Sequence, residues 1–276
     1  MQLGFLTAVM QDDPLELVTQ FAAEVGFEAL EVVAGPGGKH IDTARLTKTK
    51  AKKILNDLYD KGLVFSSLAY YTDSTDPRRR RQVIANAKKT IDAAVMLETD
   101  VVCMLAGMPV GGKSKMETIE QDVPKVFGPI VDYARRKRVK IALENWYATN
   151  IQHLDHWKRI FEVVPSKHFG LNFDPSHLYW MGIDHIEAVD LFADRIFHTH
   201  AKDCEVREHV RRRVGVLGNG WWRYCIPGYG AIDWGQYIGR LRDIGYDGVL
   251  SIEHEDRTFT PKEGLCAGLV QLEVFA

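Results

Sequence analysis

Short apolar runs alternate with longer amphipathic stretches along the whole chain. Several runs are apolar almost throughout, as in residues 101–105, which indicates strands that are buried on both faces. Strands of this kind that alternate with helical stretches are typical of parallel βαβ units. The predicted strands cover residues 3–9, 29–33, 64–71, 100–105, 139–143, 169–173, 196–200 and 248–252.

The stretches between the strands carry helix boundary signals. Asp13 and Pro14 supply a helix start, and Gly26 ends the same helix. Pro124 and Pro129 are candidate interruptions of a later helix, and a long irregular segment is expected after residue 200. The predicted helices cover residues 14–25, 48–61, 77–97, 116–137, 154–164, 186–192 and 234–244.

Eight such strand and helix units within about 250 residues match the count of a (β/α)8 TIM barrel. The rival fold is an open, doubly wound sheet, but no GxGxxG segment follows the first predicted strand. No linker or change of composition divides the chain. We therefore expect an α/β protein in which residues 1–276 form a single TIM-barrel catalytic domain.

Charge and cysteine content limit the possible surroundings of the protein. The formal net charge is −2, so no overall positive field favours nucleic acid or an anionic membrane as a partner. The first nine residues are too short and too uncharged for a signal peptide, and no apolar run has transmembrane length. Four scattered cysteines without a CxxC pair favour free thiols in a reducing compartment. A cytoplasmic protein is expected.

Four successive predicted strands in the second half end in an acid or an imidazole. These groups are Glu144, Asp174, His200 and Glu253. Because the carboxyl ends of barrel strands converge on one mouth, we expect the four side chains to meet. The set suits Mn²⁺, which we favour, or Mg²⁺, Co²⁺ or a catalytic Zn²⁺. A lone glutamate at a strand end is as often a cap or a surface ion pair, but four such ends in succession favour one metal site.

Other polar and aromatic residues lie beside these strand ends. His177 and Lys202 are candidates for polarising substrate oxygens, although Lys202 could instead form a local salt bridge with Asp203. His198 is expected to be a core histidine or to support the site from below. Trp146 offers a flat face that suits a sugar, and aromatic residues at such positions also pack cores.

Several sequence segments then make the chain similar to a known family. They are ALEN, NFDPSHLYWMGID, HTHAKD, RYCIPGYGAIDW and IGYDGVLSIEHED. They resemble the xylose isomerase-like TIM barrel superfamily and, within it, the sugar phosphate isomerase/epimerase family, which includes ketose 3-epimerases and inosose isomerases and dehydratases. The resemblance is specific in the second half of the chain and rests mainly on strand spacing in the first. It implies that Glu144, Asp174, His200 and Glu253 hold one divalent ion and that His177 contacts the substrate.

Two positions depart from the pattern of this family. The family has a substrate-binding arginine before a Pro-Gly turn, which matches Arg223 here, but a longer, arginine-rich insertion at residues 204–222 makes Arg207 a competitor. Ketose 3-epimerases carry a further glutamate six residues after the first ligand, where this chain has Asn150. This difference argues against a free-ketose 3-epimerase.

The predicted function is that of a sugar isomerase or epimerase acting on a keto-sugar or cyclitol derivative. Glu144 and Glu253 would remove and return a proton through a metal-stabilised cis-enediolate. Loss of a neighbouring substituent from the same enediolate makes a dehydratase or lyase of an inosose or 3-keto-glycoside the alternative. A barrel that binds a sugar without catalysis is the third reading.

Two basic runs, residues 78–81 and 211–213, are expected to be solvated surface. DNA-repair members of the superfamily use a trinuclear zinc site with additional histidines on strands three and four, and residues 64–71 and 101–107 contain no histidine. We therefore expect a small sugar substrate as the partner, with neither nucleic acid nor membrane. The insertion leaves a homo-oligomer open.

Overall fold

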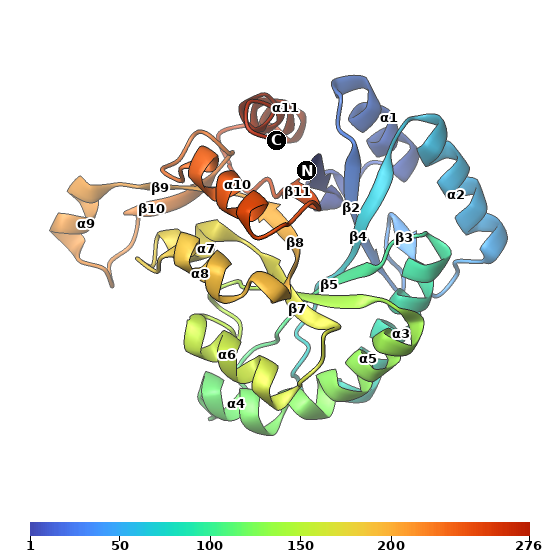
Figure 1. Cartoon of the computed structure of the whole chain (residues 1–276), viewed down its shortest axis with the longest axis horizontal. Helices are drawn as coiled ribbons and strands as arrows, with labels where there is room; N and C mark the ends of the chain where they lie inside the picture. The colour runs from blue at the N-terminus through green and yellow to red at the C-terminus, as the bar shows by residue number, and fades with distance from the viewer.

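The computed structural model describes residues 1–276 and shows a closed parallel barrel surrounded by helices (Figure 1). Neighbouring barrel strands all pair in parallel, and β1 closes the ring by pairing with both β2 and β11. The (β/α)8 prediction is confirmed. The barrel strands, in their order around the ring, are β1 (Gln2–Leu6), β11 (Val249–Ile252), β8 (Ile196–Ala201), β7 (Phe169–Phe173), β6 (Lys140–Glu144), β5 (Val101–Leu105), β4 (Val64–Tyr70) and β2 (Ala29–Gly35).

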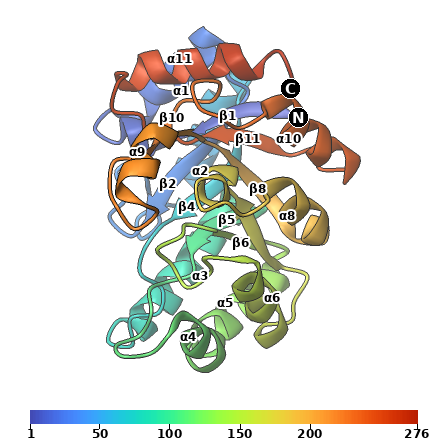
Figure 2. The same cartoon turned by 90° about the vertical axis from the view of Figure 1, so that its left-hand side faces the viewer.

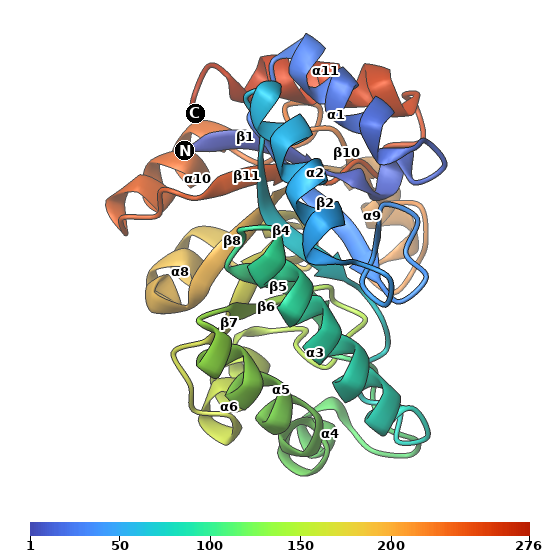
Figure 3. The same ribbon diagram turned by 90° about the vertical axis from the view of Figure 1, so that its right-hand side faces the viewer.

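Helices cover the outside of the barrel, as Figure 3 shows for the side that carries α1, α2, α3 and α5. None of the helices combines the length and the apolar character needed to cross a membrane. The covering helices are α1 (Leu15–Val25), α2 (Lys48–Asp60), α3 (Arg80–Met96), α4 (Lys115–Gln121), α5 (Val123–Lys137), α6 (Leu154–Val163), α8 (His185–Leu191), α10 (Trp234–Asp243) and α11 (Pro261–Leu272).

Some element boundaries differ from the prediction. The first strand ends at Leu6, because the chain turns there into the 3-10 helix η1 (Thr7–Met10). The helix predicted over residues 116–137 is two helices that meet at Asp122, with Pro124 in the first turn of α5, where its missing N–H costs no hydrogen bond. Elements that were not predicted are β3 (Ile41–Asp42), α7 (Pro175–Tyr179), η2 (Ala193–Arg195) and α11.

The segment after residue 200 is also more regular than expected. It forms an antiparallel pair, β9 (Asp203–Val206) and β10 (Trp222–Cys225), with α9 (Glu208–Val214) between the two strands. Figure 1 shows this hairpin projecting from the barrel, and Figure 2 views it from its own side. The prediction of an irregular segment was wrong, because the hairpin strands pair only with each other and lack the apolar pattern of the barrel strands.

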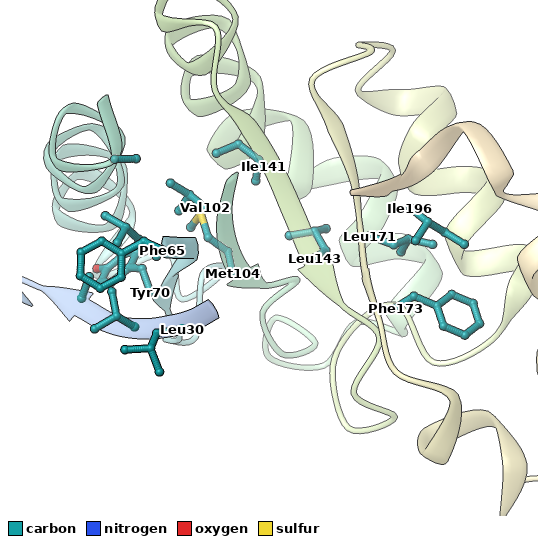
Figure 4. Close-up of a cluster of buried hydrophobic side chains, with 14 of the residues drawn as sticks. Leu30, Phe65, Tyr70, Val102, Met104, Ile141, Leu143, Leu171, Phe173 and Ile196 are labelled. Atoms are coloured by element: carbon teal, nitrogen blue, oxygen red, sulfur yellow. The ribbon is translucent and has the colours of Figure 1, made fainter. Parts of the chain in front are cut away.

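Alternate side chains of the barrel strands have different surroundings. Leu30, Ile141, Leu143 and Leu171 are buried in the large apolar core of the protein, part of which Figure 4 shows. Among the residues between them, Asn172 hydrogen-bonds across the barrel interior, and Ala142 packs in a small separate cluster with Val101 and Cys103. The period of two along each strand thus separates an apolar outer layer from a polar interior that can support a site.

The tight contact between β7 and the start of β8 gives a test of this packing. A Cβ atom at Gly170 would lie 2.2 Å from the backbone oxygen of Arg195 and 2.5 Å from the ring of Phe197. We expect Gly170→Ala to lower the free energy of unfolding by about 1–3 kcal/mol in urea denaturation, because the backbone of the next strand must move. The control is Gly239→Ala in α10, where nothing lies within 4 Å, and it should be neutral or stabilising by about 1 kcal/mol. Equal effects of the two substitutions would contradict this packing.

Candidate metal centre

The four predicted ligands come together at the carboxyl ends of adjacent barrel strands. Each offers a donor atom within 4.8 Å of the donors of the other three. Nδ1 of His200 lies 3.0 Å from Glu253, 3.8 Å from Asp174 and 3.9 Å from Glu144, measured to a carboxylate oxygen of each. Glu144 ends β6, Asp174 follows β7, His200 lies in β8 and Glu253 follows β11. The arrangement is the one that the strand ends predicted.

Two buried donor atoms of this cluster have no hydrogen-bond partner. One is Oδ2 of Asp174 and the other is Nδ1 of His200. The other oxygen of Asp174 accepts hydrogen bonds from the backbone N–H and the hydroxyl of Ser176, at 2.8 and 2.6 Å, so it caps α7. Both atoms do have charged neighbours, because Lys202 lies 3.1 Å from Oδ2 of Asp174 and Glu253 lies 3.0 Å from Nδ1 of His200. Buried polar atoms are almost always hydrogen-bonded, so two that are not fit a site for a cation.

Lys202 brings an ammonium group into direct contact with the cluster. Its ammonium group is buried and lies 2.5 Å from Glu253, 3.1 Å from Asp174 and 3.1 Å from Glu255. Burial alone would lower the pKa of Lys202, but the charges of Asp174 and Glu253 outweigh it and raise the pKa well above its usual value. Three carboxylates and an imidazole gathered at one place form a donor set that suits a divalent ion.

Glu144 and Glu253 have opposite pKa shifts in this structure. Burial raises the pKa of Glu144, and the negative charge of Glu253 raises it further. Burial also acts to raise the pKa of Glu253, but the charges of Lys202 and His200 outweigh it and lower the pKa to about 2. The two carboxylates therefore lie in different electrostatic environments within one site.

His177 lies in α7 and connects the cluster to the hairpin. Its Nε2 is 3.2 Å from Glu144, and its Nδ1 is 2.6 Å from the hydroxyl of Tyr224 in β10. Tyr224 was not among the predicted site residues, because the hairpin strand that carries it was not predicted.

Glu31 is a second residue that sequence reasoning missed. It is buried in β2 and lies 2.9 Å from Nε2 of His200, while the hydroxyls of Tyr71 and Ser251 donate to it at 2.7 and 2.9 Å. Burial would raise the pKa of Glu31, but the charges of His200 and His198 outweigh it and lower the pKa to about 2. Because a carboxylate can only accept a hydrogen bond, the 2.9 Å contact with Glu31 places a proton on Nε2 of His200. Nδ1 of the same ring is directed at the cluster. An acid in the middle of an apolar strand was the signal that could have found it.

His198 lies deeper in the barrel than His200 and is not part of the cluster. Its Nδ1 contacts the amide oxygen of Asn172 and its Nε2 contacts the hydroxyl of Ser66, both at 3.0 Å. Glu31, Cys103 and His198 also offer donors that lie close together. Because the nitrogens of His198 and the oxygens of Glu31 are already hydrogen-bonded, these three residues do not need an ion.

Asp203 does not form a salt bridge with Lys202, which was the alternative to a substrate-binding role for Lys202. Its carboxylate instead accepts hydrogen bonds from Trp234 Nε1 and from several backbone N–H groups of the loop that follows β10. Asp203 therefore holds this loop in place, and Lys202 faces the cluster.

Arg223 and Trp146 line a pocket of about 740 Å³ at the mouth of the barrel, beside the cluster. The guanidinium group of Arg223 is held by Glu205 and Asp256, at 2.5 and 2.8 Å. Arg207, the competing arginine, also pairs with Glu205 at 3.1 Å but does not line this pocket.

Asn150 is buried and bonded to the protein backbone. Its amide donates to the carbonyl oxygens of Ala106 and Met108 at 3.0 and 3.2 Å. The residue that replaces the second glutamate of the ketose 3-epimerases is thus used to hold the loop after β5.

The sequence as a whole matches the family model described as the xylose isomerase-like TIM barrel, over residues 19–269. The chain belongs to this family. A further similarity is to the uncharacterised protein YfiH of Bacillus subtilis, which is 27% identical over 96% of this chain and 96% of YfiH.

Two further similarities are to proteins with informative names. The inosose dehydratase of Geobacillus thermodenitrificans is 30% identical over 45% of this chain and 43% of that protein. The solved structure of the IOLI protein with a bound zinc atom superposes with a TM-score of 0.74 at 22% identity, and it covers 100% of this chain and 98% of that one. The similarity to the IOLI structure shows that the two proteins share the barrel fold.

We expect Glu31→Gln to weaken the binding of a divalent ion by about 10- to 100-fold, because the ring of His200 loses the charged partner that orients it. The dissociation constant for Mn²⁺ or Zn²⁺, measured by competition with a fluorescent chelator, checks this. The control is Glu98→Gln, which makes the same chemical change at a residue hydrogen-bonded to Tyr59 in an exposed contact. Equal affinities of the Glu31→Gln variant and the parent protein would contradict the role of Glu31.

Proposed function

We propose that this protein is a divalent-metal-dependent isomerase or epimerase of a keto-sugar or cyclitol derivative. The observation that carries the proposal is the placement of Glu144 and Glu253, which come from different strands into one buried cluster. Each has its own polar partner, His177 for Glu144 and Lys202 for Glu253. Two carboxylates with separate partners suit a reaction in which one group removes a proton and another returns it.

A divalent ion bound by the four donors would draw electron density from a carbonyl and a neighbouring hydroxyl oxygen and so acidify the carbon between them. The residues of the chain provide the remaining functions. Glu253 and Glu144 accept and deliver the carbon-bound proton. Lys202 Nζ and His177 Nε2 lie 3.3 Å apart beside the cluster, where both could donate hydrogen bonds to the oxygens of a substrate.

The face to which the proton returns decides the outcome. Delivery by the second carboxylate to the opposite face of the same carbon inverts that centre, and delivery to the neighbouring carbon moves the carbonyl group. Tyr147 and Tyr224 lie beside His177, with ring centroids 6.1 and 5.2 Å from its ring. These aromatic rings limit the access of water to the proton that is being transferred.

Elimination of water is the second candidate, and the similarity to inosose dehydratase favours it. It needs an acid that protonates the departing hydroxyl group. His177, held between Glu144 and Tyr224, has contacts that suit this role.

Proton transfer and elimination can be separated by NMR in deuterated water. We expect the metal-loaded protein, given a panel of ketoses, inososes and 3-keto-glucosides, to place deuterium on the carbon beside the carbonyl without loss of water. Formation of an unsaturated product would instead establish the dehydratase. Absence of both exchange and elimination with every compound would contradict an enzymatic role for the cluster.

The two carboxylates can be tested by substitution. We expect Glu144→Gln and Glu253→Gln each to lower the rate of deuterium exchange at saturating metal by about 10²- to 10⁴-fold, since each removes a group that handles the proton. Metal content is measured in the same samples, so that loss of the ion is distinguished from loss of the base. The Glu98→Gln variant serves as the control and should exchange at the parental rate. Unchanged rates in both site variants would show that other residues transfer the proton.

A further inference from the structure

The pocket beside the cluster has a wall made of aromatic rings. Most of its lining comes from the loop after β6, from β10 and from the loop after β11, and Val9 of η1 and Pro261 of α11 complete it. The aromatic residues among the lining are Trp146, Tyr147, Trp222, Tyr224 and Phe259. The five rings come from three parts of the chain that are far apart in sequence, and the hairpin supplies two of them.

The rings of this wall are held by one another. Trp222 is stacked on Trp180, with centroids 4.2 Å apart and planes inclined by 6°. Tyr147 meets both tryptophans edge-on, at 5.0 Å from Trp180 and 6.0 Å from Trp222. Trp222 is also 5.0 Å from Tyr224. Trp222 therefore occupies a fixed position, and it remains only partly buried.

The wall begins at the cluster and extends away from it. Tyr224 contacts His177, which contacts Glu144, and Glu255 contacts Lys202. Tyr224 and Glu255 line the pocket, whereas none of the four proposed metal ligands does. The space in front of Trp222 is therefore additional to the place where the reacting carbon atoms must lie.

The size of this space exceeds the need of a free sugar. A free hexose has twelve non-hydrogen atoms and takes up less room than as many water molecules, which is about 360 Å³. The pocket holds about 740 Å³ and lies beside the reaction centre. Pockets of this size with apolar walls suit ligands of more than one ring.

We propose that the substrate of the reaction is a keto-sugar that carries a second ring, and that this ring packs against the wall around Trp222. The inference rests on the proposed function, because it places the keto-sugar itself at the cluster. The shared chemistry is a ring with an apolar face, and both an aryl group and a second sugar ring offer one. Arg223, held by Glu205 and Asp256, lies in the same pocket and supplies polar contacts at its edge.

The test compares four compounds with the metal-loaded protein: 3-keto-glucose, its methyl glycoside, its phenyl glycoside and 3-keto-cellobiose. Deuterium exchange beside the carbonyl is followed by NMR, or product formation if the compound eliminates. We expect kcat/KM for at least one of the two-ring compounds to exceed that for the methyl glycoside by about tenfold or more. The methyl glycoside has the blocked anomeric oxygen without the second ring, so for proton exchange, which leaves the glycosidic bond intact, the comparison isolates the ring. If the compounds eliminate, phenoxide is the better leaving group, and the effect of Trp222 substitution on the ratio then decides.

The results distinguish an aryl group from a second sugar ring. They also distinguish failure of this inference from failure of the proposed function. A higher value for the phenyl glycoside indicates an aryl group, and a higher value for 3-keto-cellobiose indicates a second sugar. Turnover of the methyl glycoside or free sugar at the same kcat/KM as both two-ring compounds would overturn this inference and leave the proposed function intact. No reaction with any of the four would count against the proposed function and, with it, the inference.

Substitution of Trp222 provides the second measurement. Trp222→Ala should lower the ratio of kcat/KM between the two-ring compound and the methyl glycoside by about tenfold, mainly through KM, and Trp222→Phe should restore most of it. Tyr59→Ala, which removes a half-exposed ring on α2, should leave the ratio unchanged. If Trp222→Ala does not fold, the ratios of Trp222→Phe and Trp222→Leu are compared. An unchanged ratio in the variants that remove the aromatic ring would overturn the inference.

Discussion

The constraint on which the site depends is the negative charge gathered at one end of the barrel. Glu144, Asp174 and Glu253 are brought together with His200, and the ammonium group of Lys202 balances part of their charge. Burial of unpaired charge is costly, and two donor atoms of the cluster have no hydrogen-bond partner. The arrangement is therefore one that a divalent cation stabilises.

The barrel makes this concentration of charge possible. Its outer layer of apolar side chains packs under the helices and provides the stability of the fold, while the interior carries polar groups that hold the four clustered side chains in position. Asn145 joins the ends of β6 and β7 through paired hydrogen bonds to the backbone of Asp174, at 2.7 and 2.8 Å. Glu31 fixes the ring of His200 from the opposite side of the barrel. The donors are thus positioned before any ion binds.

The fold and the four clustered residues could be predicted because their signals are local. Apolar runs mark the strands, and parallel strands converge at one edge. Glu31 was missed because its contact with His200 joins residues 169 positions apart, and Tyr224 because it lies in a hairpin without a barrel-strand pattern. The sequence left open whether Lys202 pairs with Asp203. In the structure the two neighbouring side chains point in opposite directions, so that Lys202 contacts Glu253 and Asp203 binds the loop.

The central claim is that Glu144, Asp174, His200 and Glu253 share one divalent ion. It is tested most directly by crystals grown with Mn²⁺ and an anomalous difference map recorded at the manganese absorption edge. We predict one peak, bonded to Nδ1 of His200 and to oxygens of the three carboxylates at about 2.2 Å. A map without a peak among these residues, with Lys202 still paired to Asp174 and Glu253, would contradict the account.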